Sequence, residues 1–208
     1  MNILLSTAYL PPIDYIKYCV CENVFIEYAE NFTKRSYRNR CLILTANGTL
    51  CLSIPVKKTK GNNTPIKEIE IDYSMNWQLD HWRAIESAYN SSPFFEYYSY
   101  MLKPFYFSKK WKYLIDYNSD LLTLIFKMLT INPELNYTTI YQKEPTDKLD
   151  LRQLFLIHKN DQNNIENKDK YTYNQVFDYK FEFTPNLSII DLIFNLGSQS
   201  LSYLKGCN

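Results

Sequence analysis

Glycine is scarce in this chain, with 4 residues among 208. Neither a GxGxxG nor a GxxxxGK[ST] motif is present. Both motifs use glycine to bring backbone amides close to the phosphates of a nucleotide. Their absence argues against the common glycine-rich phosphate loops.

Cysteine and histidine are also few, at 5 and 2 residues. The cysteines form no C-x-x-C pair, and two histidines are too few to complete the usual zinc ligand sets. We therefore expect no metal site and free thiols in a reducing compartment. The chain shows no cofactor motif, so the sequence leaves the cofactor undefined.

Long hydrophobic runs and a strong charge of either sign are missing as well. No stretch approaches the roughly 20 apolar residues of a membrane span. The short apolar N-terminal stretch is closely followed by Asp14 and Lys17, unlike a signal peptide. The net charge is +1, too low for a general nucleic-acid binder. We expect a cytoplasmic protein without membrane insertion and without a nucleic-acid partner.

Apolar patterning in the first third predicts strands. A buried strand at residues 3–5 precedes Pro11 and Pro12, which favour a helix start. A second strand lies between Asn23 and Asn31, which completes a βαβ-like unit. Two β-branched runs at 41–46 and 49–56, joined by Asn47-Gly48, predict a hairpin with a type I′ turn.

The remainder of the chain is mainly helical. Residues 66–73 alternate as a half-exposed strand should, but helical spacing begins at Asn76 and continues to residue 132. After a strand-like stretch at 137–142 and a polar loop near 158–170, a closing helix has Ser188 at its cap and Asp191 in its first turn.

These patterns predict an α/β fold. A small mixed β-sheet, with the N-terminal βαβ-like unit and the β-hairpin, is covered by a layer of helices. We expect a single domain over 1–208, divided into a strand region (1–75), a helical layer (76–132) and a C-terminal section (133–208).

The stretch KRSYRNR, residues 34–40, concentrates positive charge. It holds four cations and no acid. Such a cluster is stable only when it is solvated, paired with acids or placed to receive an anion. In an extended strand, Lys34, Ser36, Arg38 and Arg40 share one face. Guanidinium groups bind phosphate bidentately, which favours a nucleotide or sugar phosphate as the small anionic substrate. The alternative is a solvated or acid-paired strand end.

Open α/β sheets bind ligands at the carboxyl ends of their strands, and both the YLPP loop and the basic stretch follow predicted strands on that side. The candidate substrate-binding residues are therefore Tyr9, Lys34, Arg35, Tyr37, Arg38, Asn39 and Arg40.

Two further residues are candidates from their chemistry. His81 is the candidate catalytic acid or base, because its usual pKa is near neutrality. It also lies on a stripe of small helical residues, where a packed histidine is the alternative. Asp191 is a candidate substrate-binding residue, although an acid in the first turn of a helix is also explained by the helix dipole.

Several blocks of the chain resemble the WbqC-like protein family. These are the basic stretch, HWRAIESAYNSSPFF, DLRQLFLIHK and PNLSIIDLIFNLG, spread over essentially the whole chain. The resemblance implies a bacterial protein of surface-polysaccharide (O-antigen type) or related sugar-metabolite biosynthesis. We expect a transferase-like enzyme that takes a phosphorylated or nucleotide-sugar substrate. The alternative is a non-catalytic assembly protein that docks an acidic partner and forms a homodimer through its aromatic helices.

Overall fold

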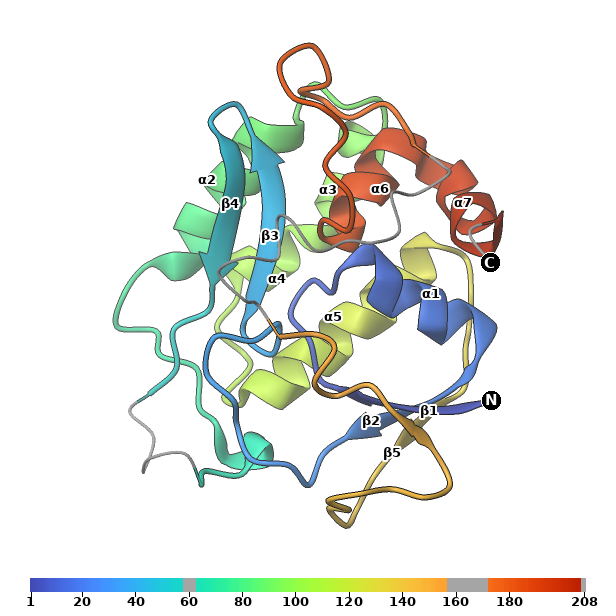
Figure 1. Cartoon of the computed structure of the whole chain (residues 1–208). Helices are drawn as coiled ribbons and strands as arrows, with labels where there is room; N and C mark the ends of the chain where they lie inside the picture. The colour runs from blue at the N-terminus through green and yellow to red at the C-terminus, as the bar shows by residue number, and fades with distance from the viewer. Residues whose placement is uncertain (58–62, 157–171, 207–208) are drawn as a thin grey trace.

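The computed structural model describes residues 1–57, 63–156 and 172–206. The polar loop predicted near 158–170 falls outside the described residues. In the described part, the chain has the α/β class that its sequence predicts (Figure 1). Its parallel strands form one sheet, and its antiparallel strands form another.

The first sheet is parallel and follows the order β5-β2-β1-β6. Its strands are β1 (Asn2–Ser6), β2 (Asn23–Glu27), β5 (Leu135–Tyr137) and β6 (Leu149–Asp150). Helix α1 (Ile13–Cys21) connects β1 to β2, so the predicted βαβ unit is confirmed. The apolar run of β1 is buried on both faces, as a central parallel strand requires. Strand β2 is shorter than predicted because the Glu27 carboxylate accepts a hydrogen bond from the Ala29 amide and the chain turns there.

The second sheet is the predicted hairpin, β3 (Arg40–Thr45) with β4 (Gly48–Ser53). The turn differs from the prediction. Thr45 pairs with Gly48, and only Gly48 of the turn has a positive φ, of 99°. Asn47 is not among the residues with a positive φ, so the connection is not the predicted type I′ turn.

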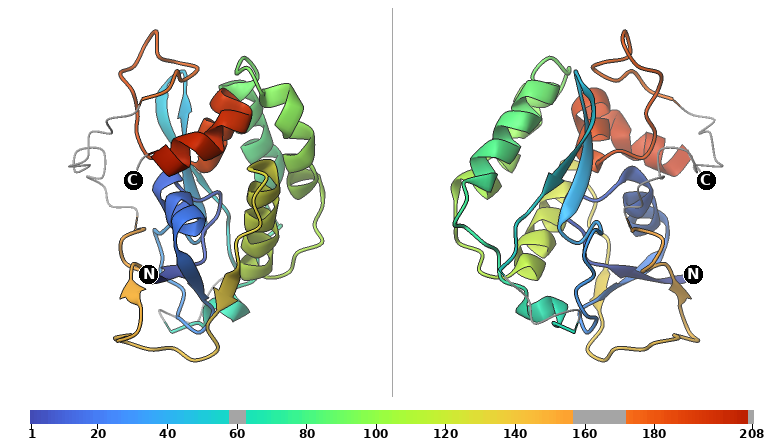
Figure 2. Two further views of the ribbon diagram at one scale, coloured as in Figure 1. Left: turned by 90° about the vertical axis from the view of Figure 1, so that its right-hand side faces the viewer. Right: turned by 60° about the vertical axis from the view of Figure 1, so that its left-hand side comes forward.

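The predicted helical layer is present. It contains α2 (Trp77–Tyr89), α3 (Phe95–Leu102), α4 (Pro104–Phe107) and α5 (Leu114–Met128). The chain closes with α6 (Ile189–Leu196), the 3-10 turn η2 (Gly197–Gln199) and α7 (Ser200–Gly206). Figure 2 shows the hairpin between α2 on one side and the C-terminal segment on the other.

Two predicted strands are absent or much shorter. Residues 66–73 contain the 3-10 turn η1 (Ile66–Glu68) and then isolated bridges, Val56 with Ile71 and Glu70 with Tyr113. The alternating pattern arises because Ile69 and Ile71 are buried. This segment forms isolated bridges with single residues and does not pair with a strand. The strand-like stretch at 137–142 contributes only Tyr137, the last residue of β5.

One hydrophobic cluster runs from Ile3 in β1 to Leu204 in α7, so it draws on all three sections of the chain. A helix long and apolar enough to cross a bilayer is not found in the part of the chain that the structure describes.

Candidate functional site

The basic stretch does not form a strand. Residues 34–39 connect β2 to β3, and Arg40 is the first residue of β3. Arg35 has a left-handed backbone with φ of 57°. This kink breaks the alternation that would place Lys34 and Arg38 on one face. Lys34 and Arg35 are exposed, whereas Ser36 and Arg38 are buried. The shared cationic face predicted from the sequence is therefore wrong.

Arg38 is paired inside the protein with Glu30. Its Nε and Nη2 donate to the two carboxylate oxygens at 2.7 and 2.5 Å, and its side chain is 1% exposed. Burial raises the pKa of Glu30, and the hydrogen bonds from Arg38 oppose that shift. Because this carboxylate already balances the guanidinium, Arg38 offers little net charge to an outside anion. Its Nη1 is buried without a hydrogen-bond partner among the described residues.

A second buried ion-pair group lies at the carboxyl ends of the parallel strands. Arg152 donates to Glu27, the last residue of β2, at 3.1 Å and to Asp150 of β6 at 2.6 Å. Its guanidinium carbon also lies 4.9 Å from the ring centre of Tyr141. The sheet edge where a ligand was predicted thus holds internal ion pairs.

The other members of the basic stretch have structural contacts. Tyr37 is buried, and its carbonyl accepts the backbone amide of Tyr9 at 2.8 Å. The Asn39 amide donates to the carbonyl of Ile54 at 2.8 Å. Arg40 is half-buried and begins β3. Their role in substrate binding stays a prediction.

Tyr9 and His81, far apart in sequence, are brought together in the core. The Tyr9 hydroxyl lies 2.9 Å from His81 Nδ1 and 2.8 Å from the hydroxyl of Tyr106. Burial lowers the pKa of His81 to about 4, so the ring is neutral at physiological pH. His81 is 6% exposed and lines neither of the two cavities described below. Its catalytic role stays a prediction, while its surroundings are those of a packed histidine.

Asp191 lies at the centre of a buried hydrogen-bond network. Its carboxylate is 1% exposed and accepts the hydroxyls of Tyr89 and Tyr173, at 3.0 and 2.6 Å. The amides of Gln175 and Asn195 donate to it at 3.2 and 3.5 Å. Burial raises the pKa of Asp191, and these donors oppose the shift. Because all four side chains donate to the same carboxylate, the network fixes their positions relative to one another.

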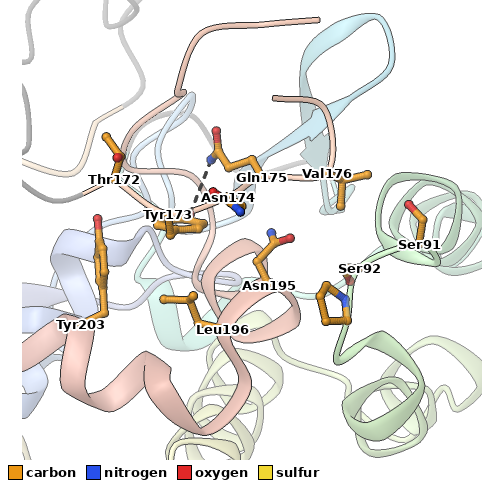
Figure 3. A pocket seen from close by; sticks show the side chains of 11 residues that line it. Ser91, Ser92, Thr172, Tyr173, Asn174, Gln175, Val176, Asn195, Leu196 and Tyr203 are labelled. Atoms are coloured by element: carbon orange, nitrogen blue, oxygen red, sulfur yellow. Dashed lines mark hydrogen bonds between the residues drawn. The ribbon is translucent and has the colours of Figure 1, made fainter. Parts of the chain in front are cut away.

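Three of those donors line a cavity of about 530 Å³. Tyr173 and Gln175 come from the segment after residue 171, and Asn195 comes from α6 (Figure 3). Ser92 and Pro93, just after α2, form the opposite side, and Tyr203 of α7 adds a ring. The lining contains hydroxyl, amide and aromatic groups and no charged side chain. This cavity, the Asp191 pocket, suits a neutral ligand rich in hydroxyl groups.

The Asp191 pocket is held by rigid neighbours. The Gln175 amide group donates to the Thr184 carbonyl and accepts the Thr184 amide, both at 2.9 Å, which ties the 172–184 segment together. The Asn195 amide also donates to the Asp191 carbonyl at 2.8 Å within α6. These hydrogen bonds orient the side chains of Gln175 and Asn195 in the pocket without a ligand.

Sequence reasoning found only Asp191 of this group. A charged residue within the apolar run IIDLIFNL was the available signal, since a helix apolar all round is buried and its acid needs partners. Tyr173, Gln175 and Ser92 lie in polar stretches with no distinguishing spacing. Ser188 does occupy the N-cap of α6, but its Oγ makes no capping hydrogen bond, and its backbone bonds to Leu42 instead.

Comparison with known proteins places these features in context. The model of the WbqC-like protein family matches residues 7–164. This range contains the basic stretch and the Ser92 side of the Asp191 pocket, and it ends before Tyr173. A protein of Mycobacterium tuberculosis (strain ATCC 25618 / H37Rv) named "Uncharacterized protein Rv1507c" is 27% identical over 225 residues, covering 98% of this chain and 97% of its own. No solved structure matches the chain.

Proposed function

Because this chain belongs to the WbqC-like protein family, we propose that it is a cytoplasmic protein of bacterial surface-polysaccharide or related sugar-metabolite biosynthesis. In this proposal it is a transferase-like enzyme that holds the sugar part of a phosphorylated or nucleotide-sugar substrate in the Asp191 pocket. The observation that carries the proposal is the uncharged, hydroxyl- and amide-lined cavity of about 530 Å³.

The pocket chemistry supports a sugar because hydroxyl groups both donate and accept hydrogen bonds. Asn195 directs its amide nitrogen to Asp191, which leaves its carbonyl oxygen for a ligand hydroxyl. The Tyr203 ring adds an apolar surface against which a sugar ring can pack. In the basic stretch, Lys34 and Arg35 are exposed, so they can meet a phosphate without breaking the Arg38–Glu30 ion pair.

Binding of nucleotide sugars and sugar phosphates, measured by calorimetry, tests the proposal. We expect Asn195→Ala to weaken binding about fivefold to tenfold, the loss of one hydrogen bond to a ligand. The control is Asn90→Ala, an exposed asparagine at the end of α2 that does not line the pocket. The proposal fails if no ligand of the series binds at millimolar concentration, or if the two variants bind equally well.

The alternative, a non-catalytic assembly protein, has one observation in its favour. Tyr97, Tyr100 and Phe107, in the consecutive helices α3 and α4, are 66%, 65% and 58% exposed and could contact a partner. Incubation with nucleotide sugars and product analysis by mass spectrometry separates the two functions. Binding without consumption of the donor supports the assembly protein.

A further inference from the structure

A second cavity, of about 510 Å³, lies at the opposite end of α2 from the Asp191 pocket. Three separate stretches form it: Lys57 after β4, residues 70–74 before α2, and residues 109–112 before α5. Four lysines converge on it, Lys57, Lys109, Lys110 and Lys112. We call this cavity the lysine groove.

Carboxylates at the lysine groove balance only part of this charge. Lys57 and Lys112 share the single carboxylate of Glu70, at 2.6 and 3.2 Å. Asp72 is the other acid in the lining, so four ammonium groups face two carboxylates there. The hydrogen bonds from Lys57 and Lys112 lower the pKa of Glu70, as expected beside surplus positive charge.

Lys109 and Lys110 are the two lysines of the groove that do not pair with Glu70. Lys109 Nζ lies 5.8 Å from the ring centre of Tyr73 and has no carboxylate within ion-pair distance among the described residues. Lys110 Nζ lies 4.2 Å from the ring centre of Trp111 and 3.5 Å from Asp120. Both side chains are exposed, so neither needs to leave the interior to meet a ligand.

The floor of the lysine groove is apolar and ordered. Trp111 and Ile71 are 5% and 2% exposed, and the Trp111 ring stacks on Phe105 at a 17° angle. The Tyr73 hydroxyl donates to the Trp111 carbonyl at 2.9 Å, which joins two of the three stretches. Lysines scattered over a surface do not share a binding site. The four lysines here line one concavity, so their charges can act on the same ligand.

We propose that the lysine groove binds the phosphate groups of a small molecule. Lysine is a common phosphate ligand. The four lysines of the groove outnumber the nearby carboxylates of Glu70, Asp72 and Asp120 by one, so positive charge is left for an anionic ligand. Helix α2 has 13 residues and therefore spans about 20 Å, which separates this groove from the Asp191 pocket. The two cavities are distinct sites, and phosphate binding here does not depend on the function proposed for the other.

Titration calorimetry of the whole chain with pyrophosphate and with UDP, against uridine as the uncharged comparison, tests this site. The variant is Lys109→Gln with Lys110→Gln, which removes two exposed charges and leaves the floor intact. We expect its affinity for both phosphates to fall about tenfold, and that of the wild-type chain to fall with added salt. Circular dichroism and the melting temperature check that the variant folds.

A matched control removes the same charge from the basic stretch, as Lys34→Gln with Arg35→Gln. We expect this variant to bind pyrophosphate and UDP as the wild-type chain does. Tighter binding of UDP than of pyrophosphate supports a nucleotide as the source of the phosphate, and equal binding supports the phosphate alone.

Three outcomes overturn the proposal. They are no binding of either phosphate at millimolar concentration, uridine binding as well as UDP, and loss of binding in the basic-stretch variant but not in the groove variant.

Discussion

His81 is an uncharged side chain of the core. It lies between the Tyr9 hydroxyl, at 2.9 Å, and the Trp77 ring, whose centre is 5.1 Å away. Burial is the main reason its pKa falls to about 4 from its usual 6.5. Protonation of the folded chain would place a charge among aromatic rings, so the unfolded chain takes up this proton first as the pH falls.

This difference predicts an acid-dependent loss of stability. A histidine with a lowered folded-state pKa stabilises fully above its unfolded value of 6.5, and the contribution is lost as the pH falls toward 4. For these two pKa values the loss between neutral pH and about pH 5 is about 2 kcal/mol. Urea unfolding at both pH values should show it in the wild-type chain and not in His81→Asn. An equal change in both proteins would mean that His81 titrates normally when folded.

Whether a charged residue is free or paired depends on its partners, and some of these are distant in sequence. Arg38 lies eight positions from Glu30, but Arg152 pairs with Glu27 across 125 positions and Tyr89 meets Asp191 across 102. The local sequence shows that Arg38 is cationic. It does not show that Arg38 is buried and paired with the Glu30 carboxylate. The sequence therefore predicted which residues of the basic stretch carry charge. It could not predict whether that charge is free to bind a ligand.

At the scale of elements, repeated spacing was the dependable signal. Helices α2 and α5 bury faces that recur every three or four residues, and the hairpin follows from two apolar runs around Asn47-Gly48. Residues 66–73 carry the alternation of a strand, but a strand also needs a partner ladder. The neighbour there, around Tyr113, pairs at single positions only.

The junction of α6 and η2 depends on a glycine. Gly197 has φ of 55°, and a Cβ atom there would lie 2.6 Å from the Phe94 ring, next to Pro93 of the Asp191 pocket. We expect Gly197→Ala to destabilise the chain by about 3 kcal/mol through backbone strain and overpacking. Gly48→Ala in the hairpin meets no atom within 4 Å, so it should lose only the backbone part, about 1 kcal/mol. Chemical denaturation compares the two, and equal losses would show that the Phe94 contact yields freely.

Across the whole molecule, positive charge is balanced both globally and internally. The chain has 23 basic and 22 acidic residues, and Arg38 and Arg152 are buried in ion pairs. The lysine groove is a local exception within the described part of the chain. It is sized for a small ligand and does not form the long basic track that a nucleic-acid backbone requires.

We therefore expect no retention of a DNA duplex or of single-stranded RNA in gel-shift assays at physiological salt. The reason is that few phosphates could be neutralised at once, and such binding weakens steeply as salt rises. The comparison is the same assay at low salt, where weak retention is expected. Stable binding at physiological salt would contradict this balance of charge.

The Asp191 network has a consequence for the order of synthesis. Tyr89 leaves the ribosome 102 residues before the carboxylate to which it donates, a delay of roughly 5 to 20 seconds at ordinary translation speed. During that interval the middle helices can pack, but the tyrosine hydroxyl lacks its carboxylate acceptor. A nascent chain stalled before α6 lacks Asp191, Asn195 and Tyr203, so it cannot form this pocket.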